Sequence, residues 1–316
     1  MPAPLQPLPR ALTGMPFSVA TGLRAGVSRG RLRHPSLHPA AFGLRTPGQP
    51  QTLAQAARAL ALVLPQPWAW SRETAAELVG LPVPEAWHPG LPLSVIRPQG
   101  SSPVRRPEVR GHLGLERRGV IFCFGMPVVD PFATWCDLAA YLDRDAAVII
   151  GDAIAARSSG PDDVRMGRTA LARLAEEVRR RSGSRGACRA RTALALVREG
   201  SRSPMETRAR LCFLEAGLPE PELNATIDDD GEWVAIADFV WRRARVIVEY
   251  QGDHHRVDKW QWRADIGRLE RLRDLGWKVI LMTAADLASR EAKAAFVGRL
   301  HGALGAAAAS PRLSMA

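Results

Sequence analysis

The chain of 316 residues is poor in several features, and each shortage excludes a class of protein. Its four cysteines lie far apart and form no Cys-x-x-Cys pair, which argues against a zinc ribbon or a disulfide scaffold and favours the reducing cytoplasm. No long uncharged apolar run occurs, so we expect no membrane span, and the Pro-rich start lacks the apolar core of a signal peptide. P-loop, His-Glu-x-x-His and Gly-x-Ser-x-Gly motifs are also missing, which disfavours an NTPase, a zincin and a serine hydrolase.

Lysines are scarce throughout the chain, and acidic residues are scarce in two of its segments. The formal net charge is +11, yet the chain holds only three lysines, so its positive charge is almost entirely arginine. No acidic residue precedes Glu73, and a second block, from Arg165 to Arg202, holds eleven arginines against three glutamates. Such a bias is typical of a GC-rich genome, but its clustering is also the electrostatic footprint of a protein that binds a polyanion.

The pattern along the chain predicts an α/β protein in two parts. Residues 1–15 are expected to be a disordered start, 16–165 an α+β module and 166–200 a basic helical linker. Residues 201–301 are expected to form a second α/β domain, and 302–316 a frayed tail. Near the start, a short helix over Phe17 to Ala25, a turn and a helix beginning near Ser28 have the order of a helix-turn-helix. The cations that such a helix would place in a DNA groove are Arg29, Arg31 and Arg33, although an amphipathic packing helix fits the pattern equally well.

The last third is expected to run helix, strand, strand, helix, strand, helix. The predicted elements are helices over Ser203–Ala216, Lys259–Leu275 and Ala284–His301, and strands over Trp233–Trp241, Arg245–Tyr250 and Trp277–Met282.

Two carboxylates stand out in this region. Asp238 lies inside a predicted strand, and Glu249 closes the apolar run Val246–Val248 of the next strand, after a hairpin turn. A carboxylate in such a place is costly unless a cation meets it, and oxygen ligands are those that Mg²⁺ prefers. The alternative is an ion pair with Arg243 or Arg245 at a solvated strand edge.

These residues resemble the core of PD-(D/E)XK nucleases, in which an acid is followed after a hairpin by an acid-x-polar pair. The run from Glu249 to Arg256, with Asp265-x-x-Arg268 and the segment Leu275–Val279, is similar to an uncharacterised branch related to very-short-patch mismatch-repair endonucleases. The resemblance covers residues 200–290. The front resembles an abortive-infection AbiEi antitoxin-type module through Gly26–Ser28, Ser71–Gly80, Thr134–Ala139 and Gly151–Ala153.

The resemblance implies a restriction-endonuclease-like mixed sheet flanked by helices, after a winged-helix-like start, and a Mg²⁺ or Mn²⁺ ion. Asp238 and Glu249 would bind the metal, with the Tyr250 carbonyl and Glu206 as further ligands. Gln251 stands where the family usually has lysine; it can orient water by hydrogen bonding but brings no positive charge. The remaining implied roles are general acid/base or phosphate binding for His254 or His255, and bracing of the site or phosphate contact for Asp265 and Arg268.

Several of these residues also have plain structural interpretations. Ser203-Pro204-Met205-Glu206 is a helix capping box, which would engage Glu206 without any metal. His254 and His255 fit a solvated loop, and Asp265 with Arg268 fits a surface ion pair. Trp260, Trp262 and Trp277 are expected to pack rather than to stack on bases.

The main hypothesis from the sequence is a metal-dependent DNA endonuclease in the cytoplasm. The runner-up is a DNA-binding regulator of antitoxin type whose nuclease fold has little activity, with a toxin or defence-system partner. RNA cleavage is a third option.

Overall fold

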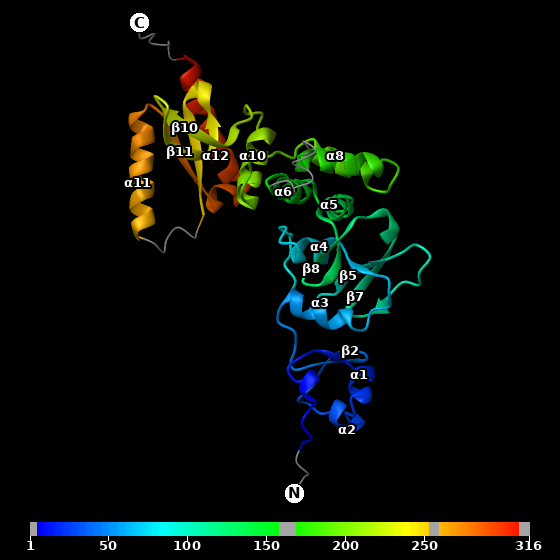
Figure 1. Cartoon of the computed structure of the whole chain (residues 1–316). Helices are drawn as coiled ribbons and strands as arrows, with labels where there is room; N and C mark the ends of the chain where they lie inside the picture. The colour runs from blue at the N-terminus through cyan, green and yellow to red at the C-terminus, as the bar shows by residue number, and fades with distance from the viewer. Residues whose placement is uncertain (1–4, 158–168, 253–258, 310–316) are drawn as a thin grey trace. The chain divides into compact units, whose positions relative to one another are not determined.

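The computed structural model describes residues 5–157, 169–252 and 259–309, and it divides into two compact units. Unit 1 comprises residues 1–146 and 176–190, and unit 2 comprises residues 147–175 and 191–316 (Figure 1). Both contain helices and mixed β-sheet, so the expected α/β class is confirmed. No helix among the described residues is long and apolar enough to cross a membrane.

Unit 1 begins with a small subdomain of two short helices and a three-stranded sheet. Helices α1 (Val19–Arg24) and α2 (Arg29–Leu32) are capped by Ser18 and Ser28, as the pattern at Ser28 predicts. Strands β2 (His38–Ala41) and β3 (Leu44–Thr46) then form a hairpin, and β3 also pairs with β1 (Phe17–Ser18). A separate small core joins these elements: Leu12, Phe17, Val27, Leu32 and Leu37. The first helix is shorter than expected because Phe17 belongs to the sheet.

The rest of unit 1 is a six-stranded mixed sheet with helices packed against it. The strand order is β6-β7-β5-β4-β9-β8, with parallel pairing of β5 to β7 and of β4 to β9. The strands are β4 (Ala69–Trp70), β5 (Leu93–Arg97), β6 (Arg105–Arg106), β7 (Val109–Leu113), β8 (Val120–Cys123) and β9 (Met126–Val129). The helices of this part are α3 (Leu53–Ala61), α4 (Arg72–Leu78) and α5 (Pro131–Ala139).

Three helices contain the points where the chain passes from one unit to the other. They are α6 (Arg144–Ala155), α8 (Ala170–Arg180) and α9 (Ala187–Leu194). The basic segment 166–200, expected as a linker, is therefore shared: residues 176–190 group with unit 1 and residues from 191 with unit 2.

Unit 2 is built on a four-stranded sheet of order β10-β11-β12-β13. Strands β10 (Glu222–Asp229), β11 (Glu232–Trp241) and β12 (Val246–Gln251) are antiparallel, and β13 (Lys278–Thr283) lies parallel to β12 after a crossover through α11 (Lys259–Asp274). On one face, α10 (Pro204–Glu215) and α12 (Arg290–Ala309) bury Phe213 and Phe296 against the sheet; on the other, α11 buries Leu272 (Figure 1).

Two expectations for unit 2 were wrong. Strand β10 was missed, although Leu223, Ala225 and Ile227 alternate with polar residues as a half-buried strand requires. The segment after His301 is not a frayed tail up to Ala309, because α12 continues that far and buries Ala303 in the core.

A buried ion pair fixes the start of α10 in unit 2. Asp152 and Arg210 are each 1% exposed, and Arg210 Nη2 lies 2.7 Å from Asp152 Oδ2. The same carboxylate accepts the Thr207 hydroxyl at 2.9 Å and the Arg198 N–H at 2.8 Å. The pair therefore connects α6 to α10 and to the segment around Arg198, which lies between α9 and α10.

Removing Asp152 should leave the buried Arg210 charge with only the more distant Glu220 carboxylate, 4.0 Å from its Nη1. We expect Asp152→Ala to lower the free energy of unfolding by about 3–5 kcal/mol, measured by urea denaturation. The matched control is Glu222→Ala, which breaks the exposed pair between Glu222 and Arg242 and should cost no more than about 1 kcal/mol. Equal losses in the two variants would contradict a structural role for the buried pair.

Candidate functional site

The two strand carboxylates lie just beyond the last ladder pair of β11 and β12, where the strands separate. The ladder pairs Phe239 with Val248, Val240 with Ile247 and Trp241 with Val246. The ladder ends there, and Asp238 and Glu249 are the next residue on each strand. Here Asp238 Oδ2 accepts the Tyr250 N–H at 2.7 Å. The side chain of Asp238 thus takes the hydrogen bond that a continued ladder would give to a backbone oxygen.

Glu249 is held by an arginine from the crossover helix. It is 4% exposed, and Arg268 Nη1 of α11 lies 3.0 Å from its Oε1. A buried carboxylate needs such a partner, because its desolvation is otherwise uncompensated. Of the two arginines expected as possible partners, Arg245 instead donates to the Leu275 carbonyl at 2.6 Å.

Asp238 sits in a strongly perturbed environment. Burial raises its pKa to about 6, and the nearby charge of Glu206 adds to this effect. The Tyr250 N–H, Arg268 and Arg202 act in the opposite direction without cancelling it. Ionised Asp238 therefore lacks sufficient compensating positive charge, which is a feature common at functional sites.

Glu206 contributes to helix capping and to this electrostatic field at once. Its N–H donates to the Ser203 side chain at 3.1 Å, so the predicted cap by Ser203 is confirmed. Its carboxylate accepts the Arg202 N–H at 2.9 Å and the Asn224 amide at 2.8 Å. Ser203 therefore caps α10, whereas the Glu206 carboxylate binds the N–H one residue before the cap, and its charge acts on Asp238.

Asn224 is the residue that sequence reasoning missed. It belongs to β10, has a left-handed backbone with φ of 44° and falls between the paired residues Leu223 and Ala225, opposite Asp238. Its amide donates to Glu206 and, at 2.8 Å, to the Gly200 carbonyl. Asparagine tolerates this conformation better than most residues, so its identity at that place in an alternating strand was an available signal.

The remaining predicted site residues lie on β12 and α11 or outside the described part. Gln251 ends β12, half-buried and two residues after Glu249, so the two share a face. Tyr250 packs on the opposite face against the core with Phe213. His254 and His255 lie outside the described residues, and so does the side chain of Asp265. Trp277 packs beside Leu272 under the Arg245 guanidinium, as expected.

The donor chemistry at Asp238 and Glu249 fits a hard divalent cation. Among the described side chains, no three His, Cys, Asp or Glu residues converge closely enough to hold a metal ion. Asp238 and Glu249 nevertheless offer carboxylate oxygens from neighbouring strands, which are the ligands that Mg²⁺ and Mn²⁺ prefer. A cation would also offset the buried negative charge that raises the pKa of Asp238.

The three arginines predicted to bind DNA differ in their surroundings. Arg29 and Arg33 are exposed at the two ends of the four-residue helix α2. Arg31 is half-buried, and its guanidinium donates to the Gln6 carbonyl and to the Ser36 hydroxyl, both at 2.9 Å. Arg31 therefore holds the local fold together, whereas Arg29 and Arg33 are available to solvent.

Comparisons with known proteins name no activity. No family model matches the chain, and no solved structure matches it. Uncharacterised proteins from two strains of Mycobacterium tuberculosis, CDC 1551 / Oshkosh and ATCC 25618 / H37Rv, are each 29% identical over 157 residues. The match covers 50% of this chain and 55% of each relative, so the chain spans about half the length of the curated relatives it matches.

The raised pKa of Asp238 makes stability depend on pH. Well below its ordinary pKa of 3.8 this carboxyl is protonated in both the folded and the unfolded chain. As the pH rises to 6 and beyond, the unfolded chain loses the proton first, so this contribution to stability is lost. Asp238→Asn stays neutral and can still accept the Tyr250 N–H. We therefore expect the variant to gain about 2–3 kcal/mol on the wild type between pH 4 and 7.5.

Urea unfolding at several pH values measures this difference. The control is Glu232→Gln, which neutralises an exposed carboxylate on the same strand and should follow the wild type. Parallel pH profiles for wild type and Asp238→Asn would show that Asp238 is not perturbed.

Proposed function

We propose that the chain is a metal-dependent endonuclease that hydrolyses phosphodiester bonds of DNA, with its catalytic centre at the separating ends of β11 and β12. The observation that carries this proposal is the pair of strand carboxylates, Asp238 and Glu249, within the negative field of Glu206. If Glu249 and Arg268 formed only a structural ion pair, no further carboxylates would be needed beside it. Glu206 nevertheless lies close enough to Asp238 to raise its pKa.

The arrangement of unit 2 supports the proposal. A helix bearing an acid is followed by an antiparallel hairpin bearing the two other acids, then by a crossover helix and a parallel strand. This is the order that the resemblance to PD-(D/E)XK nucleases implies. Strand β10 adds Asn224, which binds Glu206 from the edge of the sheet.

Each residue then has a role, which for Gln251 comes from the resemblance to the nuclease core. Asp238 and Glu249 would hold Mg²⁺ or Mn²⁺, and the bound ion would supply charge stabilisation for the phosphate and a more acidic water. Gln251, on the same face as Glu249, orients the attacking water through its amide. Arg268 fixes the carboxylate of Glu249, and Asn224 with the Arg202 N–H fixes that of Glu206.

A DNA-binding regulator with little nuclease activity is the second candidate. Two observations favour it: Gln251 stands where the resemblance expects lysine, and Arg268 occupies one oxygen of Glu249. The small subdomain of α1, α2 and the β2–β3 hairpin has the element order of a winged helix, a common DNA-binding module. A toxin or defence-system partner belongs to this second candidate.

Substitution of the strand carboxylates tests the catalytic centre. We expect Asp238→Ala and Glu249→Ala each to reduce Mg²⁺- or Mn²⁺-dependent nicking of supercoiled and mismatched DNA by about 100-fold or more. Glu232→Ala, which removes an exposed carboxylate from β11, should nick as the wild type does.

The outcome separates the two candidates. Cutting that all three variants retain would overturn the site. An absence of cutting by wild type, with salt-sensitive DNA binding intact, would favour the regulator; Gln251→Lys would then be expected to raise nicking if only the missing positive charge limits turnover.

The exposed arginines of α2 test the N-terminal contact with DNA. We expect Arg29→Ala with Arg33→Ala to weaken duplex binding and to lower the slope of log affinity against log salt by roughly 2, because two phosphate contacts are lost. Arg31 is kept because it maintains the fold, and Arg105→Ala, exposed elsewhere in unit 1, is the control. An unchanged slope, measured by fluorescence anisotropy, would assign α2 to packing alone.

A further inference from the structure

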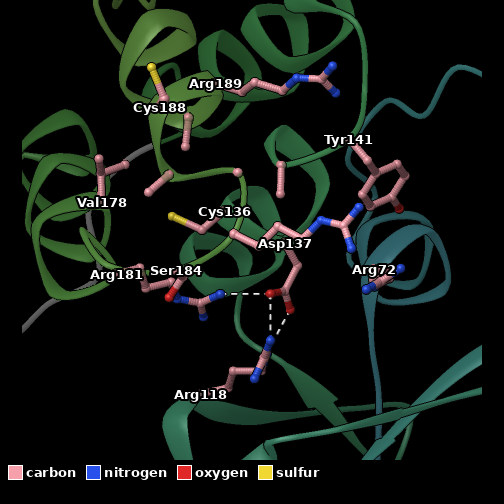
Figure 2. Close-up of a pocket in the computed structure, with 15 residues that line it drawn as sticks. Arg72, Arg118, Cys136, Asp137, Tyr141, Val178, Arg181, Ser184, Cys188 and Arg189 are labelled. Carbon is pink, nitrogen blue, oxygen red and sulfur yellow. Dashed lines mark hydrogen bonds and ion pairs between the residues drawn. The ribbon is translucent and has the colours of Figure 1, made fainter.

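A second concentration of charge lies in unit 1, and its sign is opposite to that of the carboxylate site. A cavity of about 600 Å³ is bounded by the start of α4, the end of α5 and residues 178–190 (Figure 2). Its charged lining consists of five arginines and one carboxylate: Arg72, Arg118, Arg181, Arg185, Arg189 and Asp137. The volume lies within the range of small-molecule sites, and the lining is strongly positive.

The floor of the cavity is a preorganised cluster. Asp137 accepts two hydrogen bonds of 2.7 Å from Arg118 and a third of 2.7 Å from Arg181 (Figure 2). Burial opposes ionisation of Asp137, but the hydrogen bonds and charges of Arg118 and Arg181 outweigh it and lower its pKa. Asp137 therefore stays ionised and fixes these two guanidinium groups in place. Arg181 Nη2 is buried and has no hydrogen-bond acceptor among the described residues.

The wall carries further arginines without a carboxylate partner. Arg185 and Arg189 are exposed, and no described acidic side chain pairs with either of them. Arg72 lies with its guanidinium 5.1 Å from the centroid of the Tyr141 ring. Its backbone is left-handed, with φ of 50°, a conformation that costs a non-glycine residue energy and that clusters at ligand sites.

Close packing holds the opposite wall against α5. Gly186 has φ of 84°, and a Cβ added there would lie 2.4 Å from the Cβ of Ala140. A side chain at this position would push residues 184–190 away from α5. The glycine thus lets the segment that bears Arg185 and Arg189 approach the cluster around Asp137.

We infer that this cavity binds a ligand carrying two or more phosphate groups, of the size of a nucleoside triphosphate or smaller. Guanidinium groups match phosphate oxygens with paired hydrogen bonds, and rigid ones lose little freedom on binding. Asp137 in the lining and Glu177, which pairs with Arg181 Nε at 2.7 Å, stand against five arginines, and the remaining excess of positive charge exceeds what a single carboxylate ligand would neutralise. Free polyphosphates and the backbone of a nucleic acid share this chemistry.

Titration of the full chain with defined probes tests the inference. Pyrophosphate, ATP and adenosine are titrated by isothermal calorimetry in 0.15 M NaCl with EDTA, so that no divalent ion contributes at the carboxylate site. We expect saturable binding of pyrophosphate and ATP but not of adenosine. Arg185→Ala with Arg189→Ala should weaken it by roughly ten-fold or more, because charge-assisted hydrogen bonds are lost.

The controls separate a built site from general attraction to a basic protein. Arg105→Ala removes one exposed charge outside the cavity and should bind as the wild type does. Both targeted arginines are exposed, so circular dichroism melts should confirm an unchanged fold, and Arg189→Gln provides a milder variant.

A short DNA duplex identifies the source of the phosphates. Binding of the duplex alone, weakened by the double variant, would overturn the assignment to a small ligand and give the cavity to the nucleic-acid backbone. Absence of saturable binding by every phosphate probe, or equal affinity of the double variant and Arg105→Ala, would overturn the inference.

Discussion

The buried ion pair between Asp152 and Arg210 anchors α10, the helix that carries Glu206. Charges this deeply buried are stable only with close partners, so their mutual attraction fixes α6 against α10. Asp152 also accepts the hydroxyl of Thr207, the residue after Glu206. The first turn of α10 is thereby locked, and with it the carboxylate whose charge reaches Asp238. The position of Glu206 in the candidate site thus depends on the Asp152–Arg210 ion pair, which contacts neither Asp238 nor Glu249.

Each unit leaves charge of one sign incompletely compensated: negative charge in unit 2 and positive charge in unit 1. In unit 2, buried carboxylates are partly compensated by Arg268 and by backbone N–H groups, and an excess of negative charge remains. In unit 1, Asp137 organises arginines, and an excess of positive charge remains. Uncompensated charge of either sign costs stability in the free protein, and a counter-charged ligand recovers that cost when it binds.

The sequence predicted elements whose local signals agree with their tertiary setting. The cap at Ser203 and the hairpin that carries Asp238 and Glu249 follow from short-range rules, and both are present. Strand β10 was missed because its polar face dominates its composition, and Asn224 was lost with it. The contact between Arg268 and Glu249 depends on the path of α11 across the sheet. No pattern of residue spacing along the chain specifies that path. The cavity of unit 1 combines segments separated by more than a hundred residues. From the sequence, its arginines could therefore be recognised only as part of a basic segment, and not as the lining of a cavity.

The interleaved composition of the two units has a consequence for synthesis on the ribosome. Unit 1 needs residues 176–190, which follow the first segment of unit 2 in the chain. At roughly 5–20 residues per second, several seconds pass between emergence of residue 146 and of the segment that completes unit 1. During that interval the end of α5, on which Gly186 later packs, is not covered by that segment. Unit 1 can be completed once residue 190 has emerged, before most of unit 2 has been synthesised.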